Sequence, residues 1–205
     1  MSQLDLSSDE ARVSYGIGLQ LGNQLRDNPP PGAQLDAILA GITDAFNGLE
    51  IRVSNEALNA SFQVIRERMQ AEAAAKAERA AAAGVEYLAA NAQREGVTVL
   101  PSGLQYEILT AGEGARPSKE DTVRTHYHGT LIDGTVFDSS YQRGKPAEFP
   151  VGGVIKGWIE ALQLMPEGSK WRLHVPSELA YGAQDMGSIP PHSVLIFDVE
   201  LIKIL

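Results

Sequence analysis

The chain has 205 residues, of which 43% are hydrophobic and 21% are charged, as in an ordinary soluble globular protein of one or two domains. Its formal charge of −9 argues against binding to a nucleic-acid backbone, which requires clustered lysines and arginines. Because cysteine is absent, the sequence excludes disulfides, a thiol nucleophile and a cysteine-based zinc site.

The sequence lacks the patterns of membrane and export segments. No apolar run approaches the ~20 residues of a membrane span. The opening residues, MSQLDLSSDE, contain neither a basic nor an apolar segment of the signal-peptide kind. We therefore expect a cytoplasmic protein with no membrane and no nucleic-acid partner.

Two short helices are expected before residue 50. A capping box, in which Glu10 follows Ser7 by three positions, predicts that the first helix begins at Ser7. Glycines at positions 16, 18 and 22 thin its apolar face, which indicates close approach of another backbone; a frayed helix is the alternative. A second helix is expected to follow, with Gly48 placed to terminate it. The residues on its apolar side are Leu35, Ile38, Leu39, Ile42, Ala45 and Phe46.

A third helix is expected from Ser54 to Gly96, which corresponds to a length of ~60 Å at a rise of ~1.5 Å per residue. Its first half carries an apolar stripe, whereas nine of the thirteen residues at 71–83 are alanine and the other four are charged. We interpret this half as a solvated rod that can bend at Gly84. The alternative is a helix that lies flat on the next domain through its alanines.

The N-terminal helices bury too little surface to be stable alone. A second copy of the same chain would cover their wide apolar faces, so we expect a symmetric homodimer. The predicted organisation is an N-terminal dimerisation unit at 1–53, a long alanine-rich connecting helix at 54–96 and a C-terminal domain at 97–205.

After Gly96 the pattern changes to strands and indicates an antiparallel α+β domain. Asp133-Gly134 is a hairpin signal between two of the strands. A single short helix at 154–162 places Trp158 on its apolar side, where the indole would face the sheet. The predicted strands lie at 104–109, 122–131, 136–138, 147–151, 170–175 and 194–204.

The residue inventory does not indicate covalent or metal chemistry. His126 and His128 share one side of a strand, but without an evident third ligand they favour a surface or hydrogen-bonded couple over a metal pair. Instead, aromatic and apolar side chains are dense around a few polar ones. They either form core or line a pocket, and the pattern alone leaves both interpretations open. These residues are Tyr127, Phe137, Asp138, Trp158, Tyr181 and Phe197.

Several blocks of the C-terminal domain, in order and spacing, resemble the FKBP-type peptidyl-prolyl cis-trans isomerases. They are VRTHYHG at 123–129, GTVFDSS at 134–140, VIKGW at 154–158, AYG at 180–182, IPP at 189–191 and LIFDVEL at 195–201. The glycine-thinned helices and the alanine-rich helix resemble the dimeric bacterial branch, which includes the macrophage infectivity potentiators.

This resemblance implies an FKBP-like sheet wrapped on the short helix, with a proline pocket between them. It implies Trp158 as the floor, Tyr181 and the Ile155 amide as hydrogen-bond donors, and Asp138 near the reacting amide, held by Tyr127 and Arg143. The remaining implied pocket residues are Phe137, Val154, Ile189 and Phe197. The sequence departs from well-known members of the family at Ala147, Gly153 and Ser188.

The resemblance implies an isomerase that needs no cofactor and acts on X-Pro bonds of unfolded or partly folded proteins by stabilising a twisted amide. Macrolides such as tacrolimus and rapamycin are the implied inhibitors. Two other functions stay open. The dimer would be a chaperone or binding module with weak isomerase activity, or a scaffold whose C-terminal domain docks a partner.

Overall fold

The computed structural model describes residues 4–27 and 29–205. They form two compact units, with the boundary between Ala71 and Glu72. Helices come first and an antiparallel sheet with one α-helix follows, so the α+β class expected from the sequence is confirmed. Within the described part of the chain, no helix is both long enough and apolar enough to span a bilayer.

The first two helices have nearly the predicted bounds. Helix α1 runs from Asp9 to Asp27 and α2 from Leu35 to Phe46. The prediction of Ser7 as the cap is wrong by one residue, because the hydroxyl of Ser8 accepts the hydrogen bond from the Ala11 amide at 3.2 Å. Gly48 does terminate α2: its φ is +63°, and the next amide bonds back across the turn.

Helix α3 is continuous from Asn55 to Asn91 and ends before the predicted Gly96. The buried Asn91 side chain bonds to Gln105, and after it the chain passes through turns into a first strand that the sequence did not reveal. The expected weak point is also wrong, since Gly84 is buried inside an unbroken helix. At Gly84 the helix packs against Val194 of the C-terminal unit, whereas no residue at 71–83 is buried.

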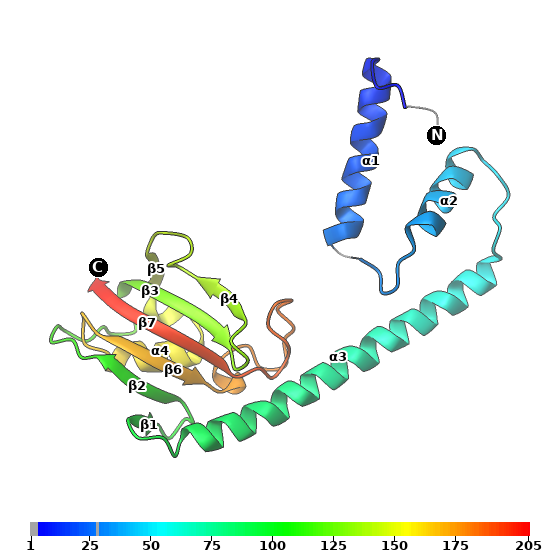
Figure 1. Ribbon diagram of the computed structural model, residues 1–205. Helices are drawn as coiled ribbons and strands as arrows, with labels where there is room; N and C mark the ends of the chain where they lie inside the picture. The colour runs from blue at the N-terminus through cyan, green and yellow to red at the C-terminus, as the bar shows by residue number, and fades with distance from the viewer. Residues whose placement is uncertain (1–3, 28) are drawn as a thin grey trace. The chain divides into compact units, whose positions relative to one another are not determined.

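The sheet has seven strands, all paired antiparallel, in the order β1-β2-β6-β7-β3-β4, with β5 paired to β3 (Figure 1). The predicted turn at Gly134 joins β3 to β4, and its φ is +87°. The strands are β1 Val97–Val99, β2 Gln105–Thr110, β3 Thr122–Leu131, β4 Val136–Ser139, β5 Ala147–Pro150, β6 Lys170–Val175 and β7 Leu195–Ile204.

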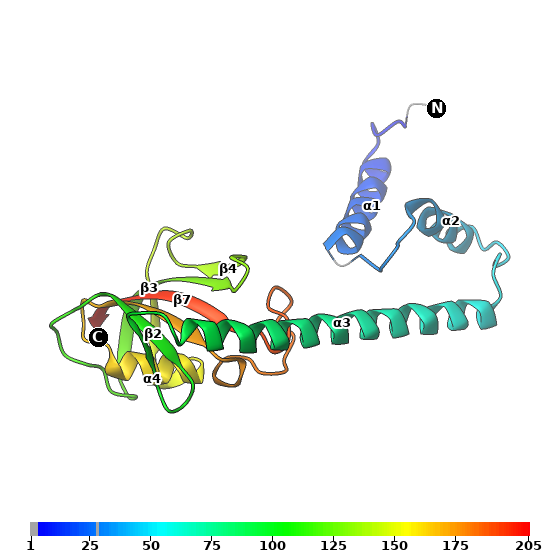
Figure 2. The same ribbon diagram turned by 60° about the horizontal axis from the view of Figure 1, so that its bottom comes forward.

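Helix α4, Lys156–Leu164, lies along one face of this sheet (Figure 1, Figure 2). It starts two residues after the predicted beginning, because Val154 and Ile155 are extended and Ile155 is the N-cap. A Cβ at Gly157 would lie 2.5 Å from Val175, so this glycine allows the helix to approach β6 closely. The inner face of β7 alternates as expected and buries Leu195, Phe197, Val199 and Leu201 against α4.

Candidate active site

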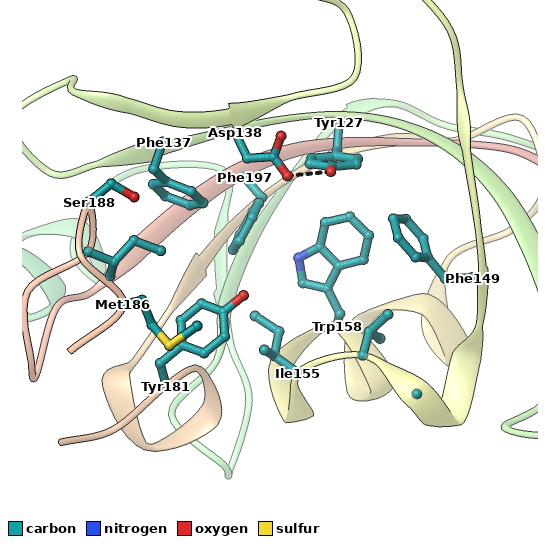
Figure 3. A pocket seen from close by; sticks show the side chains of 13 residues that line it. Tyr127, Phe137, Asp138, Phe149, Ile155, Trp158, Tyr181, Met186, Ser188 and Phe197 are labelled. Atoms are coloured by element: carbon teal, nitrogen blue, oxygen red, sulfur yellow. Dashed lines mark hydrogen bonds between the residues drawn. The ribbon is translucent and has the colours of Figure 1, made fainter. Parts of the chain in front are cut away.

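A hollow of about 660 Å³ opens between α4, the inner face of the sheet and the segment that follows β6 (Figure 3). Most of its lining is aromatic or aliphatic, with a few polar groups, as in many ligand pockets. The lining residues are Tyr127, Phe137, Asp138, Phe149, Gly153, Val154, Ile155, Trp158, Tyr181, Met186, Ser188, Ile189 and Phe197.

Trp158 forms the floor, and its side chain is held from three sides. The rings of Tyr127, Phe149 and Phe197 meet the indole edge-on, with centroid distances of 5.4, 5.9 and 5.2 Å. Such edge-to-face contacts fix the orientation of a ring. The indole Nε1–H is buried and has no hydrogen-bond partner among the described residues. The floor is therefore rigid and apolar, with one donor left unused.

A pair of phenylalanines forms one wall. Phe137 on β4 and Phe197 on β7 pack edge-on at 5.4 Å between ring centroids. Gly129 on β3 makes room for them, since a Cβ there would lie 2.7 Å from the Phe137 ring and 3.0 Å from the Phe197 ring. The glycine in the VRTHYHG block is thus explained by the shape of the hollow.

Asp138 belongs to a three-membered polar cluster at the edge of the hollow. The Tyr127 hydroxyl donates to its carboxylate at 2.5 Å, and the Arg143 guanidinium donates both to this carboxylate and to the Tyr127 oxygen. Burial opposes ionisation of Asp138, but the hydrogen bonds from Tyr127 and Arg143, the charge of Arg143 and the backbone bond from Ser139 together hold the pKa of Asp138 below its usual range. Burial and the hydrogen bond to Asp138 raise the pKa of Tyr127. At neutral pH the cluster therefore holds a carboxylate and a neutral phenol.

Two donors are available where the hollow opens. The Tyr181 side chain points its hydroxyl into the hollow (Figure 3). Ile155 lines the hollow at the N-cap of α4 with φ −60° and ψ 151°, and a cap amide lies outside the bonding pattern of its helix. Within the described residues, neither the Tyr181 hydroxyl nor the Ile155 amide has a hydrogen-bond partner.

The rim of the hollow is a tight loop between Tyr181 and Ile189. The Met186 amide bonds to the Ile189 carbonyl at 3.1 Å, and Gly187 between them has a φ of +76°. This turn brings Met186 and Ser188 to the hollow, where Met186 stays 47% exposed. The side chains at the rim are thus accessible to a ligand that extends beyond the floor.

The hollow unites nearly all the residues singled out in the sequence. Tyr127, Trp158 and Phe197 belong to the core and also line the hollow, so the two interpretations left open for them both hold. Arg143 does not line it but contacts two residues that do. The functional roles of these residues stay predictions. The other predicted residues that line the hollow are Phe137, Asp138, Val154, Ile155, Tyr181 and Ile189.

Sequence reasoning missed Phe149 and Met186. Phe149 was inside a predicted strand, where its alternation with Ala147 was a usable signal, because both are half-buried on the same side of β5. It supplies an aromatic lining residue in the segment where Ala147 departs from the family pattern. Met186 was in a loop without periodicity, so only the folded chain reveals its position.

The histidine couple on β3 is hydrogen-bonded, as one of the two interpretations expected. His126 and His128 bond through Nδ1 to Ser140 and Ser139, at 2.9 and 3.0 Å. No group of three or more metal-ligating side chains occurs in the described part of the chain. These histidines alternate with Tyr127 along β3, so they lie on the opposite face of the sheet from the hollow.

Comparisons with known proteins cover both units. Residues 113–202 match the family model described as FKBP-type peptidyl-prolyl cis-trans isomerase. Residues 10–108 match the model described as the domain amino terminal to that isomerase.

Individual relatives match over nearly the whole chain. An Escherichia coli protein, the FKBP-type 22 kDa peptidyl-prolyl cis-trans isomerase, is 53% identical over 96% of this chain and 96% of its own. The Outer membrane protein MIP of Legionella longbeachae is 44% identical over 97% of this chain and 87% of its own. Among solved structures, FkpA from Escherichia coli superimposes with a TM-score of 0.70 and 37% identity, covering 98% of each chain.

Proposed function

We propose, since this chain belongs to the family of FKBP-type peptidyl-prolyl cis-trans isomerases, that the hollow above Trp158 is where it rotates X-Pro bonds. The chain is an enzyme of this class. The observation that carries the proposal is an accessible aromatic hollow with a rigid floor and two unused donors at its opening.

The hollow lowers the rotation barrier by changing the surroundings of the amide. Rotation about a peptide bond costs ~18–20 kcal/mol, and uncatalysed X-Pro exchange takes tens to hundreds of seconds. At the transition state the amide is twisted, has lost its resonance and is less polar than the planar form. Water favours the planar form, whereas an apolar hollow removes that preference. Each ~1.36 kcal/mol taken off the barrier accelerates exchange tenfold.

Each part of the hollow has a distinct task in this mechanism. Trp158, Phe197 and Phe137 receive the proline ring and exclude water. The Tyr181 hydroxyl and the Ile155 amide donate to substrate carbonyls and hold the chain in place while the amide twists. Asp138, ionised and fixed by Tyr127 and Arg143, shapes the wall and the local field. No covalent step and no proton transfer is required.

The two tryptophans offer a direct test of binding. Trp158 and Trp171 are both 4% exposed, and both indole N–H groups lack a partner among the described residues. Only Trp158 lines the hollow, since Trp171 is on β6 and stacks on Tyr106. Titration of a proline tetrapeptide into the ¹⁵N-labelled chain should shift the Trp158 indole resonance and leave Trp171 unchanged. Catalysed exchange without any Trp158 shift would place the reaction elsewhere.

For the N-terminal unit we propose homodimerisation through α1, α2 and the start of α3. Among the described residues up to Ala71, Asp44 is the only buried one, held by an ion pair with Arg52 at 2.7 Å. Many large apolar side chains on the three helices are 44–89% exposed, and a second copy of the chain would cover them. They include Tyr15, Ile17, Leu19, Leu39, Ile42, Phe46, Phe62 and Met69.

A dimer would bring two hollows to one client, so we further propose that it holds partly folded chains during isomerisation. The discriminating experiment compares the full chain with residues 72–205, the compact unit that retains the end of α3. Equal turnover of a tetrapeptide, together with about tenfold slower catalysis of a proline-limited refolding reaction by the fragment, would support holding. Equal rates on both substrates would reduce the protein to an isomerase alone, and weak turnover by both would favour a binding module.

Two narrower proposals concern inhibitors and compartment. Tacrolimus and rapamycin are proposed ligands of the hollow, with Gly153 and Ser188 as the lining positions that alter their fit. Inhibition of tetrapeptide turnover measures this directly. We propose the cytoplasm as the compartment, although one relative is named an outer membrane protein. Fractionation of the source cells followed by immunoblotting decides this question.

A further inference from the structure

The rim loop is attached to the rest of the C-terminal unit by an unusual residue. His192 has a φ of +61°, the only positive φ of a non-glycine residue in the described part of the chain. Its amide donates to the Gly182 carbonyl at 2.7 Å, and the Gly182 amide in turn donates to Ser177 at 2.8 Å. Gly182 directly follows Tyr181. The backbone of His192 therefore fixes the residue next to one of the donors of the hollow.

The end of α3 packs against this attachment. Gly84 is buried, and a Cβ there would lie 2.8 Å from Val194 Cγ2 and 3.9 Å from the His192 carbonyl oxygen. A cavity of about 100 Å³ at this contact is lined by α3 residues on one side and by Ser177, His192 and Val194 on the other. Glycine lowers helix stability relative to alanine, so its presence at this buried position is explained by the close approach.

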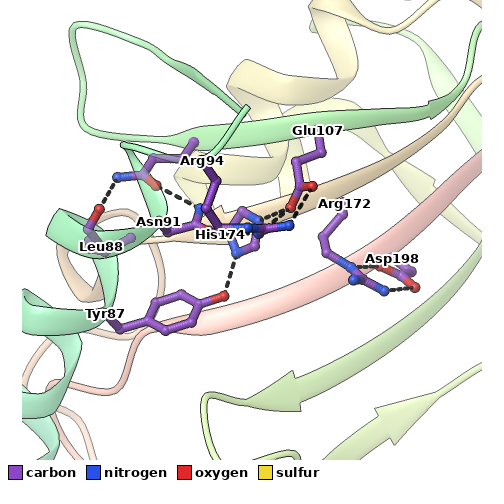
Figure 4. A network of polar contacts seen from close by, with 9 residues as sticks. Tyr87, Leu88, Asn91, Arg94, Glu107, Arg172, His174 and Asp198 are labelled. Atoms are coloured by element: carbon purple, nitrogen blue, oxygen red, sulfur yellow. Dashed lines mark hydrogen bonds and ion pairs between the residues drawn. The ribbon is translucent and has the colours of Figure 1, made fainter. Parts of the chain in front are cut away.

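Helix α3 cannot simply retreat from the contact, because polar bonds hold it to the sheet (Figure 4). The Asn91 side chain donates to Gln105 at 2.8 Å, and Gln105 donates to the Leu88 carbonyl at 2.9 Å. The Tyr87 hydroxyl bonds to the buried His174 at 2.8 Å. These contacts come one and two turns after Gly84, so a change at Gly84 is transmitted to Val194 rather than absorbed by the helix.

We propose that Gly84 and Val194 are positioning residues for the isomerase: their contact sets the place of His192 and Gly182, and thereby of Tyr181 and the rim loop. The proposal rests on the hollow being the reaction site. The floor holds the proline ring, while the rim contacts the rest of the substrate. A shift of the rim therefore changes the discrimination between substrates that differ in the residue before proline.

The test uses the full chain and a four-member mutant cycle of wild type, Gly84→Ala, Val194→Ala and the double variant. For each, kcat/KM is measured on two tetrapeptides that differ only in the residue before proline, one alanine and one leucine. The ratio of the two values does not depend on the amount of folded enzyme. Each single variant should change this ratio about threefold or more, in the range of coupling between touching residues.

The double variant should return the ratio toward the wild-type value, because the added methyl group occupies the space that the shortened side chain leaves. In the double variant, the Cβ added at position 84 would lie 3.7 Å from the Cβ of residue 194, which is an ordinary contact distance. Ala82→Ser, on the exposed side of the same helix, is the matched control and should leave the ratio unchanged.

A lower thermal midpoint with an unchanged ratio in the single variants would overturn the proposal and make Gly84 a purely structural glycine. A double variant that departs further from wild type would do the same. Should Gly84→Ala fail to fold, Val194→Ala alone decides, since it loosens the same contact from the other side. Turnover by the wild type, measured in the same series, separates failure of this inference from failure of the reaction site.

Discussion

The two units of the chain treat their apolar side chains in opposite ways. In the C-terminal unit, Leu162, Leu173 and Leu195 are fully buried between α4 and the sheet. In the N-terminal unit, Phe46 is 89% exposed and Phe62 67% exposed, although both are on well-formed helices. Secondary structure alone therefore does not complete a fold: the C-terminal unit has its own core, whereas the large apolar side chains of the N-terminal helices stay exposed in the single chain.

The largest effect on stability and turnover is expected at Trp158, which belongs to the core and also forms the floor of the hollow. Trp158→Ala should lower the free energy of unfolding by about 3–5 kcal/mol and abolish turnover, because it removes a buried indole and the surface that receives proline. Denaturant unfolding and a tetrapeptide assay measure the two effects. Ile108→Ala, at an exposed position of β2, is the control and should change stability by less than about 0.5 kcal/mol. Retained turnover in a folded Trp158→Ala variant would show that Trp158 does not form the surface that receives proline.

The complementary change addresses the N-terminal unit. Ile42→Glu should weaken dimerisation by about 2 kcal/mol or more, since a charge cannot be buried in an apolar interface without a partner. Sedimentation at micromolar concentration would show a monomer, while kcat/KM for a tetrapeptide stays unchanged. Loss of tetrapeptide turnover in this variant would refute the independence of the two units.

A smaller effect is expected at the polar edge of the hollow. Asp138→Asn removes the ion pair with Arg143 but keeps the shape of the side chain, so turnover should fall about tenfold without being abolished. Complete loss of turnover with an intact fold would assign Asp138 a direct chemical role instead.

The same residue makes a prediction about pH. The folded-state pKa of Asp138 lies below the ordinary value, so its contribution to stability is full above pH ~4 and is lost as the pH falls through the lowered pKa. The difference in thermal midpoint between wild type and Asp138→Asn should therefore be constant from pH 5 to 7 and shrink below pH ~4. If this difference in thermal midpoint grew on acidification, the assignment of Asp138 as an ionised carboxylate in the folded protein would be wrong.

The smallest effect belongs to the junction of α3 and the sheet. Burial lowers the pKa of His174, although the hydrogen bond to Glu107 acts in the opposite direction. Hydrogen bonds from His174 and Arg94 lower the pKa of Glu107 and keep its carboxylate ionised. The unfolded chain therefore binds a proton that the folded chain does not, and stability should decline as the pH falls below ~6.5. In the His174→Gln variant, the thermal midpoint should decline less steeply between pH 7 and pH 5 than in the wild type. An equally steep decline in the variant would assign it to other groups.

The sequence predicted the elements whose signals are local. Neighbouring residues alone indicate three features that the structure confirms: the alternation along β7, the turn at Gly134 and the capping glycine Gly48. Most of the pocket followed from its resemblance to a known family. Helix α4 was placed within two residues, because Trp158 and Leu162 mark its buried side.

What the sequence did not reveal depends on contacts between distant segments. The three-residue strand β1 is too short for a period and exists through its pairing with β2. Gly84 looked like a hinge because the sequence does not show Val194 beside it. The partners of His174, Tyr87 and Glu107, lie 87 and 67 residues away from it in the chain. Such partners become visible only when the chain is folded.

We propose that the aromatic hollow rotates the X-Pro bond by replacing the water around it. Phe137 is the residue to change, because it lines the hollow and is only half-buried, so the fold can survive its truncation. The measurement is kcat/KM of full-length Phe137→Ala on a proline tetrapeptide, with circular dichroism to verify folding. The account predicts a folded protein with turnover reduced by about a hundredfold, or ~2.7 kcal/mol in the barrier. Wild-type turnover in a folded Phe137→Ala chain would contradict it.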